Sequence, residues 1–279
     1  MIVNALNWLR NHKVINLVLV LLYVAFVVFA HDAFVQLSIF ALQSLSLPVY
    51  NAVVAVIGVV ILLFLALSVY RALKQKVELD RTGLPFLGIT VVALIVHFFV
   101  FTEMNIEFIH AAEFGIFGFL LYPLVGRFSA VPIVALPILC LDEWYQYQVL
   151  YPGYVEYFDF NDLQMDLLGI GLVLSLLKTF KLTVPTPTNS QNKTELLLLV
   201  GYAVVAVSLV SIGFISLYPV QATESTWLVL NQISEPYGFW RLHPDNDAYY
   251  HVLEPAVGSL VVLGWCVFYS FMDSSKLAK

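Results

Sequence analysis

Charged residues are scarce in this sequence, and so are cysteines. Only 11% of the 279 residues are charged, 61% are hydrophobic and the mean hydropathy is +0.87, whereas a soluble domain carries about 25% charged residues. The shortage of charge excludes an ordinary soluble protein and indicates an integral membrane protein. The two cysteines, Cys140 and Cys266, lie in separate apolar runs, so we predict small core residues and not a disulfide.

A surplus of basic residues is also missing. The chain has 13 Lys and Arg against 19 Asp and Glu, which gives a formal net charge of −6. Such a chain offers no basic face to phosphate, so we expect no nucleic-acid partner. We expect the lipid bilayer to be the main partner of a chain with this composition.

Apolar runs long enough to cross about 30 Å of hydrocarbon recur along the chain. The stretch from Asp32 to Leu47 is apolar but short for a span, so we interpret it as an interfacial or re-entrant segment. The runs predict an all-α, polytopic bundle of eight transmembrane helices, at residues 14–30, 49–70, 85–101, 106–125, 128–146, 161–180, 195–218 and 251–271.

Three units follow from this division of the chain. Residues 1–84 hold two helices and the interfacial segment, and residues 85–182 hold a four-helix core. Residues 183–279 hold a cytoplasmic linker, the last two helices and an outer aromatic loop.

The basic residues predict the orientation of the spans, because Lys and Arg are retained on the cytoplasmic side during insertion. Eight spans with both termini cytoplasmic place twelve of the 13 basic residues on that side, and only Arg241 falls outside. Fifteen of the 19 acidic residues and five of the six histidines then lie on the outer side or in the outer parts of spans. The outer half is therefore an acidic mouth that carries histidines.

Ionisable residues recur about one helical turn apart in four of the predicted spans. Such groups cost free energy in hydrocarbon, so they must face a protein or water-lined interior. Capping explains Asp159 or Asp162 at a helix start, but not Asp166, which lies a turn or more inside its span. In span order the ionisable residues are Glu107, His110 and Glu113; Asp142 and Glu143, with Gln146 one turn from both; Asp159, Asp162 and Asp166; and Asp247, His251 and Glu254.

Carboxylates and imidazoles spaced in this way are what a metal site in a helical bundle requires. A single His or Glu near a membrane surface is usually structural, so the prediction depends on four helices converging at one depth. We expect a divalent metal ion, with Glu113, Glu143 and Asp166 as candidate catalytic residues. The predicted metal ligands are Glu107, His110, Glu113, Asp142, Glu143, Asp162, Asp166, His251 and Glu254.

Residues 85–180 resemble the VanZ-like family, small polytopic proteins of the bacterial envelope. The family patterns are His-x-x-Glu-aromatic-x-x-Leu/Phe-Gly, Asp-Glu-x-x-Gln, and Pro-Gly-Arg followed by Asp-x-x-x-Asn-x-x-Gly. They resemble, in this order, His110, Glu113, Phe114, Phe117 and Gly118; Asp142, Glu143 and Gln146; and Pro152, Gly153, Asp162, Asp166 and Gly169. The resemblance implies a multi-pass protein of the bacterial inner membrane.

The chain departs from the family pattern at two polar positions. Tyr154 stands where the family has arginine, and Asp166 stands where it has asparagine. Both changes leave the mouth more acidic, which argues against a role that needs an arginine to hold an anion.

Three functions remain open, and whether the chain is an enzyme remains open with them. The first is a cavity that binds a cation or metal and acts on or senses an envelope lipid or small molecule. The second is a non-catalytic membrane subunit that binds a partner protein through its outer loop 219–250, where membrane anchoring is the alternative role of the aromatics. The third is proton-coupled transport. The loop carries Trp227, Tyr237, Phe239, Trp240 and Arg241.

Overall fold

The computed structural model describes residues 2–45, 47–74, 78–102, 105–153, 155–184, 193–233, 238–242 and 249–273, and these residues are mostly helical. The helices are α1 (Ile2–Asn11), α2 (Lys13–Ser44), α3 (Leu47–Lys74), α4 (Leu84–Val100), α5 (Ile109–Val125), α6 (Val131–Tyr145), α7 (Phe160–Thr179), α8 (Lys193–Ser211) and α9 (Pro255–Ser270). Two 3₁₀ turns, η1 (Asn105–Phe108) and η3 (Pro219–Gln221), and a π-helix, η2 (Gln146–Leu150), join them.

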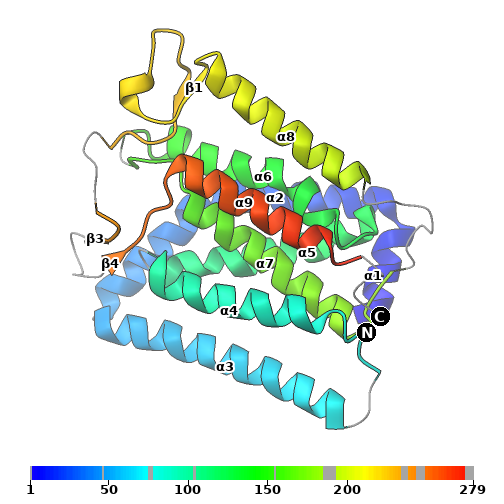
Figure 1. Cartoon of the computed structure of the whole chain (residues 1–279). Helices are drawn as coiled ribbons and strands as arrows, with labels where there is room; N and C mark the ends of the chain where they lie inside the picture. Colours follow the sequence, from blue (N-terminus) through cyan, green and yellow to red (C-terminus); the bar gives the residue numbers. More distant parts are fainter. Residues whose placement is uncertain are drawn as a thin grey trace.

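The helices lie side by side in one bundle. α1 begins and α9 ends at one end of it, and the short strands β1 (Ile215–Ser216), β3 (Arg241–Leu242) and β4 (Tyr249–Tyr250) lie at the other (Figure 1). β1 pairs in parallel with β2 (Leu228–Val229), and β3 pairs antiparallel with β4. We call the end that carries the strands the strand end and the opposite one the terminal end.

α7 is the central helix of the bundle. It packs against α4, α5, α6 and α9. In its apolar 18-residue stretch 83% of the residues are buried, against 0% in the corresponding stretch of α3. α3 and α8 lie at opposite edges of the bundle (Figure 1) and expose valine and leucine side chains. A helix that exposes apolar side chains in this way is suited to lipid as its solvent.

Within the described residues, four helices are long and apolar enough to cross a membrane. They are α2, α3, α7 and α8, and the apolar helices α4, α5 and α9 are shorter. These helices are consistent with a membrane location. The eight-span topology and the cytoplasmic position of both termini stay predictions.

Helix boundaries differ from the predicted spans in three places. The separate segment predicted from Asp32 to Leu47 is wrong, because α2 continues unbroken to Ser44 in a stretch without proline or glycine. α8 ends at Ser211 and not at residue 218, just before Gly213, whose φ of 73° ends the helical path. α9 begins at Pro255 and not at residue 251, because proline favours the first helical position.

The close packing of α5 on α7 positions the polar residues of both helices. A Cβ at Gly169 would overlap the backbone of Ala111, and a Cβ at Gly115 would press on Val173 and on the carbonyl of Gly169. Small residues let two helix backbones approach closely. His110, which precedes Ala111, is thereby brought against the face of α7 that carries the acids.

Candidate functional site

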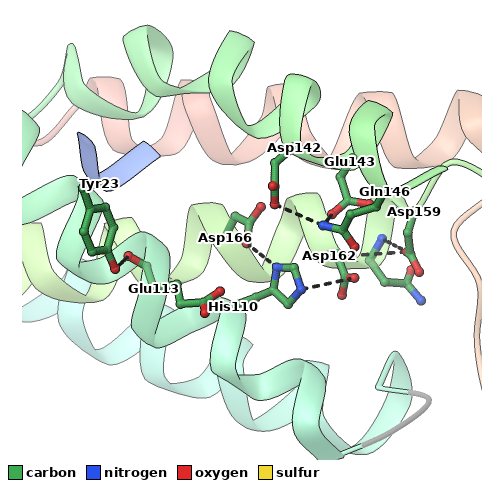
Figure 2. A network of polar contacts seen from close by, with 10 residues as sticks. Tyr23, His110, Glu113, Asp142, Glu143, Gln146, Asp159, Asp162 and Asp166 are labelled. Atoms are coloured by element: carbon green, nitrogen blue, oxygen red, sulfur yellow. Dashed lines mark hydrogen bonds and ion pairs between the residues drawn. The ribbon is translucent and has the colours of Figure 1, made fainter. Parts of the chain in front are cut away.

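Six of the nine predicted metal ligands lie together inside the bundle. We call this group the His110 cluster; Figure 2 shows its side chains pointing toward one another between three helices. α5 supplies two of them, α6 two and α7 two, and every one is buried. Its members are His110, Glu113, Asp142, Glu143, Asp162 and Asp166.

The imidazole of His110 lies between two carboxylates of α7. Its Nδ1 is 3.1 Å from Oδ1 of Asp166, and its Nε2 is 3.7 Å from Oδ2 of Asp162. His110 is 3% exposed and Asp166 is fully buried. A neutral imidazole has one N–H donor and one acceptor, so this ring hydrogen-bonds one carboxylate and can present its other nitrogen to a cation.

One amide holds the two acids of α6 together. Nε2 of Gln146 donates to Oδ2 of Asp142 at 3.1 Å and to Oε1 of Glu143 at 3.3 Å (Figure 2). The π-helix η2 begins at Gln146, whose backbone N–H reaches the carbonyls of both acids. Such a widened turn is frequent at functional sites, and this one directly follows the turn of α6 that carries the two acids.

Several carboxylate oxygens in the cluster are buried without a partner. Oε1 of Glu113, Oδ1 of Asp142 and Oδ2 of Asp166 accept no hydrogen bond from the described residues. The Tyr23 hydroxyl donates to the backbone carbonyl of Glu113 at 3.0 Å and not to its side chain. The Lys and Arg ion pairs that the structure describes also lie elsewhere. The cluster therefore holds more carboxyl groups than its own hydrogen bonds and ion pairs satisfy.

Three members of the cluster can converge on one ion. A nitrogen of His110 and an oxygen each of Asp142 and Glu143 lie within 4.8 Å of one another, and all three residues are buried. One imidazole and two carboxylates suit zinc, iron or manganese. The partnerless oxygen of Asp142 is the sort of atom that a cation would satisfy, so the donor set fits a divalent metal ion.

The other three predicted ligands lie outside the cluster. Glu107 lies in the 3₁₀ turn η1, before α5 begins, and does not join the group that can converge on one ion. The ring of His251 stacks on Phe239 with centroids 3.9 Å apart, and its Nδ1 is 2.6 Å from the Phe239 carbonyl. Glu254 is exposed and accepts a hydrogen bond from the Tyr218 hydroxyl at 3.0 Å.

The predicted helical stripe of Asp247, His251 and Glu254 is wrong. Tyr249 and Tyr250 form strand β4, residues 251–254 are not helical, and α9 starts at Pro255. Asp247 lies outside the described residues. The cluster therefore draws on three helices and not on four.

Two histidines and one asparagine near the cluster were not predicted as site residues. The ring centroids of His31 and His110 lie 5.6 Å apart, and His97 is 1% exposed on α4. The only signal for these histidines in the sequence is their place in the outer half of the chain. Asn161 donates to the carbonyls of Phe101 and His251, so it joins α7 to the segments after α4 and before α9.

Two simpler predictions are confirmed. Asp159 caps α7, because its side chain accepts hydrogen bonds from the backbone N–H groups of Asn161 and Asp162. Cys140 and Cys266 are free cysteines.

The outer loop 219–250 is only partly described. Trp227 stacks between Phe214 and Trp144, while Phe239 and Trp240 are 60% and 48% exposed. Tyr237 lies outside the described residues.

Comparisons with protein-family models, curated proteins and solved structures find no match for this chain. Its fold and site define it only as a helical chain with apolar helices of membrane-crossing length and a buried cluster of acids around one histidine. The resemblance to the VanZ-like family stays a prediction.

Proposed function

We propose that this chain is a VanZ-like, multi-pass protein of the bacterial inner membrane that binds a divalent metal ion at the His110 cluster. The bound ion serves a reaction on an envelope lipid or small molecule, or the sensing of one. The predicted topology puts the cluster near the extracytoplasmic side, because it lies toward the end of the bundle opposite the termini.

The observation that supports this proposal is the uncompensated acidity of the cluster. Five buried carboxyl groups surround one imidazole, and three of their oxygens have no hydrogen-bond partner among the described residues. A buried carboxylate without a partner costs several kcal/mol. A bound cation removes that cost, and the same binding energy would hold three helices together.

The residues divide into two roles. His110, Asp142 and Glu143 hold the ion, since these three can converge on one point. Asp166 orients the His110 ring, and Gln146 orients both acids of α6. Such outer partners fix the ligands of most metal sites. A bound ion of this class supplies Lewis acidity or an activated water.

Glu113 is the candidate proton carrier of the site. It is buried beside His110, and its side chain has no hydrogen bond to the described residues. A carboxyl group that no neighbour holds is able to take up or release a proton during a reaction.

Elemental analysis tests the proposal. The protein is purified in mild detergent without chelators or metal-affinity resin, next to His110→Ala and Glu143→Gln. We expect close to one equivalent of a transition metal or zinc in the wild type and its loss in both variants.

Glu254→Gln is the matched control. Glu254 belongs to the predicted ligand set but is exposed and outside the cluster, so this variant should keep the metal. A metal-free wild type, or metal that survives both cluster substitutions, would refute the proposal.

A second candidate function is a membrane subunit that binds a partner protein through the outer loop. The exposed side chains of Phe239 and Trp240 favour it, because aromatics are enriched at binding hot spots. A pulldown in mild detergent should recover a stable partner that is lost in a Phe239→Ser/Trp240→Ser double variant. A monodisperse chain without a partner would count against this function.

A further inference from the structure

A groove of about 600 Å³ lies at the corner where α1 meets α2, at the terminal end of the bundle. α1 lies across this end and does not run along the bundle (Figure 1). The apolar side of α1 faces the protein, because Leu6 and Leu9 are buried and the helix packs against α5. The groove is lined by Arg10, Asn11, His12, Lys13, Val14 and Ile15.

The lining of the groove changes from polar to apolar along the chain. Residues 10–13 are polar, and the next two, Val14 and Ile15, are 76% and 45% exposed in the first turn of α2. Trp8 is 47% exposed on α1, and its ring stacks on His12 with centroids 4.7 Å apart. An exposed tryptophan at a boundary between polar and apolar surface is typical of the level at which lipid headgroups lie.

The two cations of the groove have no counter-ion in the part of the chain that the structure describes. The ion pairs of lysine and arginine described there all involve other residues. Lys13 is exposed, whereas Arg10 is partly buried: its Nη1 is inaccessible, and the exposed part of its side chain lines the groove. A guanidinium that is partly removed from water favours an anion beside it. The partner that this groove lacks is therefore an anion.

We propose that the groove binds an anionic phospholipid, with the phosphate between Arg10 and Lys13 and the start of an acyl chain against Val14 and Ile15. Arginine and lysine are the usual side chains that bind phosphate. The apolar wall favours a lipid over a free phosphate ion, which would gain nothing from apolar contact. The predicted topology puts this corner at the cytoplasmic leaflet, whose surface is negatively charged. The inference goes beyond the proposed function, because the groove lies away from the His110 cluster and needs no metal.

Native mass spectrometry of the full chain in mild detergent tests the inference. The two probes are dioleoyl phosphatidylglycerol, which is anionic, and dioleoyl phosphatidylcholine, which has the same acyl chains and no net charge. We expect the anionic lipid to bind about tenfold more tightly. Arg10→Gln/Lys13→Gln should weaken its binding about 10- to 30-fold, since each basic residue near a membrane surface contributes about a factor of five.

Arg71→Gln/Lys74→Gln is the matched control. It removes the same charge from two exposed residues at the end of α3, also on the predicted cytoplasmic side. This variant should bind the anionic lipid as the wild type does. A loss of binding in Arg10→Gln/Lys13→Gln with unchanged thermal unfolding excludes misfolding as its cause.

The free headgroup separates a lipid site from a phosphate site. Glycerophosphoglycerol, the headgroup of the anionic lipid without acyl chains, should not displace that lipid at equal concentration. Displacement by the free headgroup would overturn the inference. So would equal binding of the two lipids, or binding to Arg10→Gln/Lys13→Gln that matches binding to the control variant.

Discussion

The proposed site depends on a single residue, Gln146, for the orientation of two of its carboxylates. Its amide nitrogen is the donor that Asp142 and Glu143 share. Without it the two carboxylates repel each other and lose their common direction. Gln146 is also the first residue of the π-helix η2, and its backbone N–H reaches the carbonyls of both acids.

Replacing Gln146 with leucine should weaken metal binding about 10- to 100-fold, the usual effect of losing a group that orients a ligand. The variant keeps the volume of the side chain, so the helices should still assemble. Competition with a chelator of known affinity measures the change. Gln221→Leu, at an exposed position on the outer loop, should bind as the wild type does; equal affinities in all three proteins would show that Gln146 has no positioning role.

Contacts within one helix could be predicted at this scale, and contacts between helices could not. The helical repeat alone places Gln146 one turn from Asp142 and Glu143. The contact of His110 with Asp166 joins residues 56 positions apart, and only the packing of α5 on α7 creates it. The predicted place of His251 was wrong for a related reason. The spacing of His251 and Glu254 in the sequence is the same whether their segment is helical or not, and this segment is not helical because α9 begins only at Pro255.

The interface of α5 with α7 is the element that assembles the site. Gly169→Ala should force the two helices apart, because its Cβ would overlap the backbone of Ala111. We expect a loss of about 1–3 kcal/mol in stability, typical of overpacking, and a parallel loss of bound metal. Thermal unfolding in detergent measures the first effect.

Gly201→Ala on α8 is the control for that substitution. A Cβ there meets nothing within 4 Å, and alanine favours a helix over glycine. This variant should be at least as stable as the wild type. If both alanine variants behaved alike, close approach at Gly169 would not be what holds α5 on α7.

Asp80 joins the connection between α3 and α4 to the end of α7. Its carboxylate accepts hydrogen bonds from the backbone N–H and hydroxyl of Thr82 and lies 3.3 Å from Nζ of Lys178. Its partial burial acts to raise its pKa, but these hydrogen bonds and the lysine charge outweigh burial and hold the pKa below its ordinary value of 3.8. A lowered pKa means that the folded state favours the ionised carboxylate.

Asp80→Asn should therefore destabilise the protein at neutral pH. The stabilisation by Asp80 is fully present above the pKa of the unfolded chain and is lost as the pH falls through the lower folded value. Thermal unfolding of both proteins should show a gap that is constant near pH 7 and closes below about pH 4. A gap that stays constant down to pH 3 would contradict this role.

Helix positions were largely predictable, and helix ends were less so. Long apolar runs identify the helices, but hydropathy does not show that α2 continues to Ser44, because a short apolar stretch beyond a span fits either a longer helix or a separate segment. Local signals identify the ends correctly: Gly213 after α8 and Pro255 at the start of α9.

For the whole molecule, the predicted topology puts the terminal end in the cytoplasm and the strand end outside. Val220 is 91% exposed on the outer loop, and Arg81 is exposed on the α3–α4 connection. A membrane-impermeant maleimide should label Val220→Cys in intact cells and Arg81→Cys only after permeabilisation. The reverse pattern, or labelling of both in intact cells, would overturn the orientation.

Apolar and polar residues occupy different parts of the bundle. Apolar side chains cover the edge helices α3 and α8, and the polar residues at membrane depth gather around α7. An acid placed there must be neutralised by a cation or by a proton, whereas an acid on a solvated surface need not be. The central claim is therefore that the bundle is built around a metal ion.

X-ray absorption spectroscopy of the metal-loaded wild type and of His110→Ala tests that claim most directly. The account predicts a metal shell of oxygen and nitrogen at about 2.0–2.2 Å, with outer-shell scattering from one imidazole in the wild type. His110→Ala should lose that imidazole signature or the metal itself. A wild-type spectrum without imidazole, or one that His110→Ala leaves unchanged, would contradict the account.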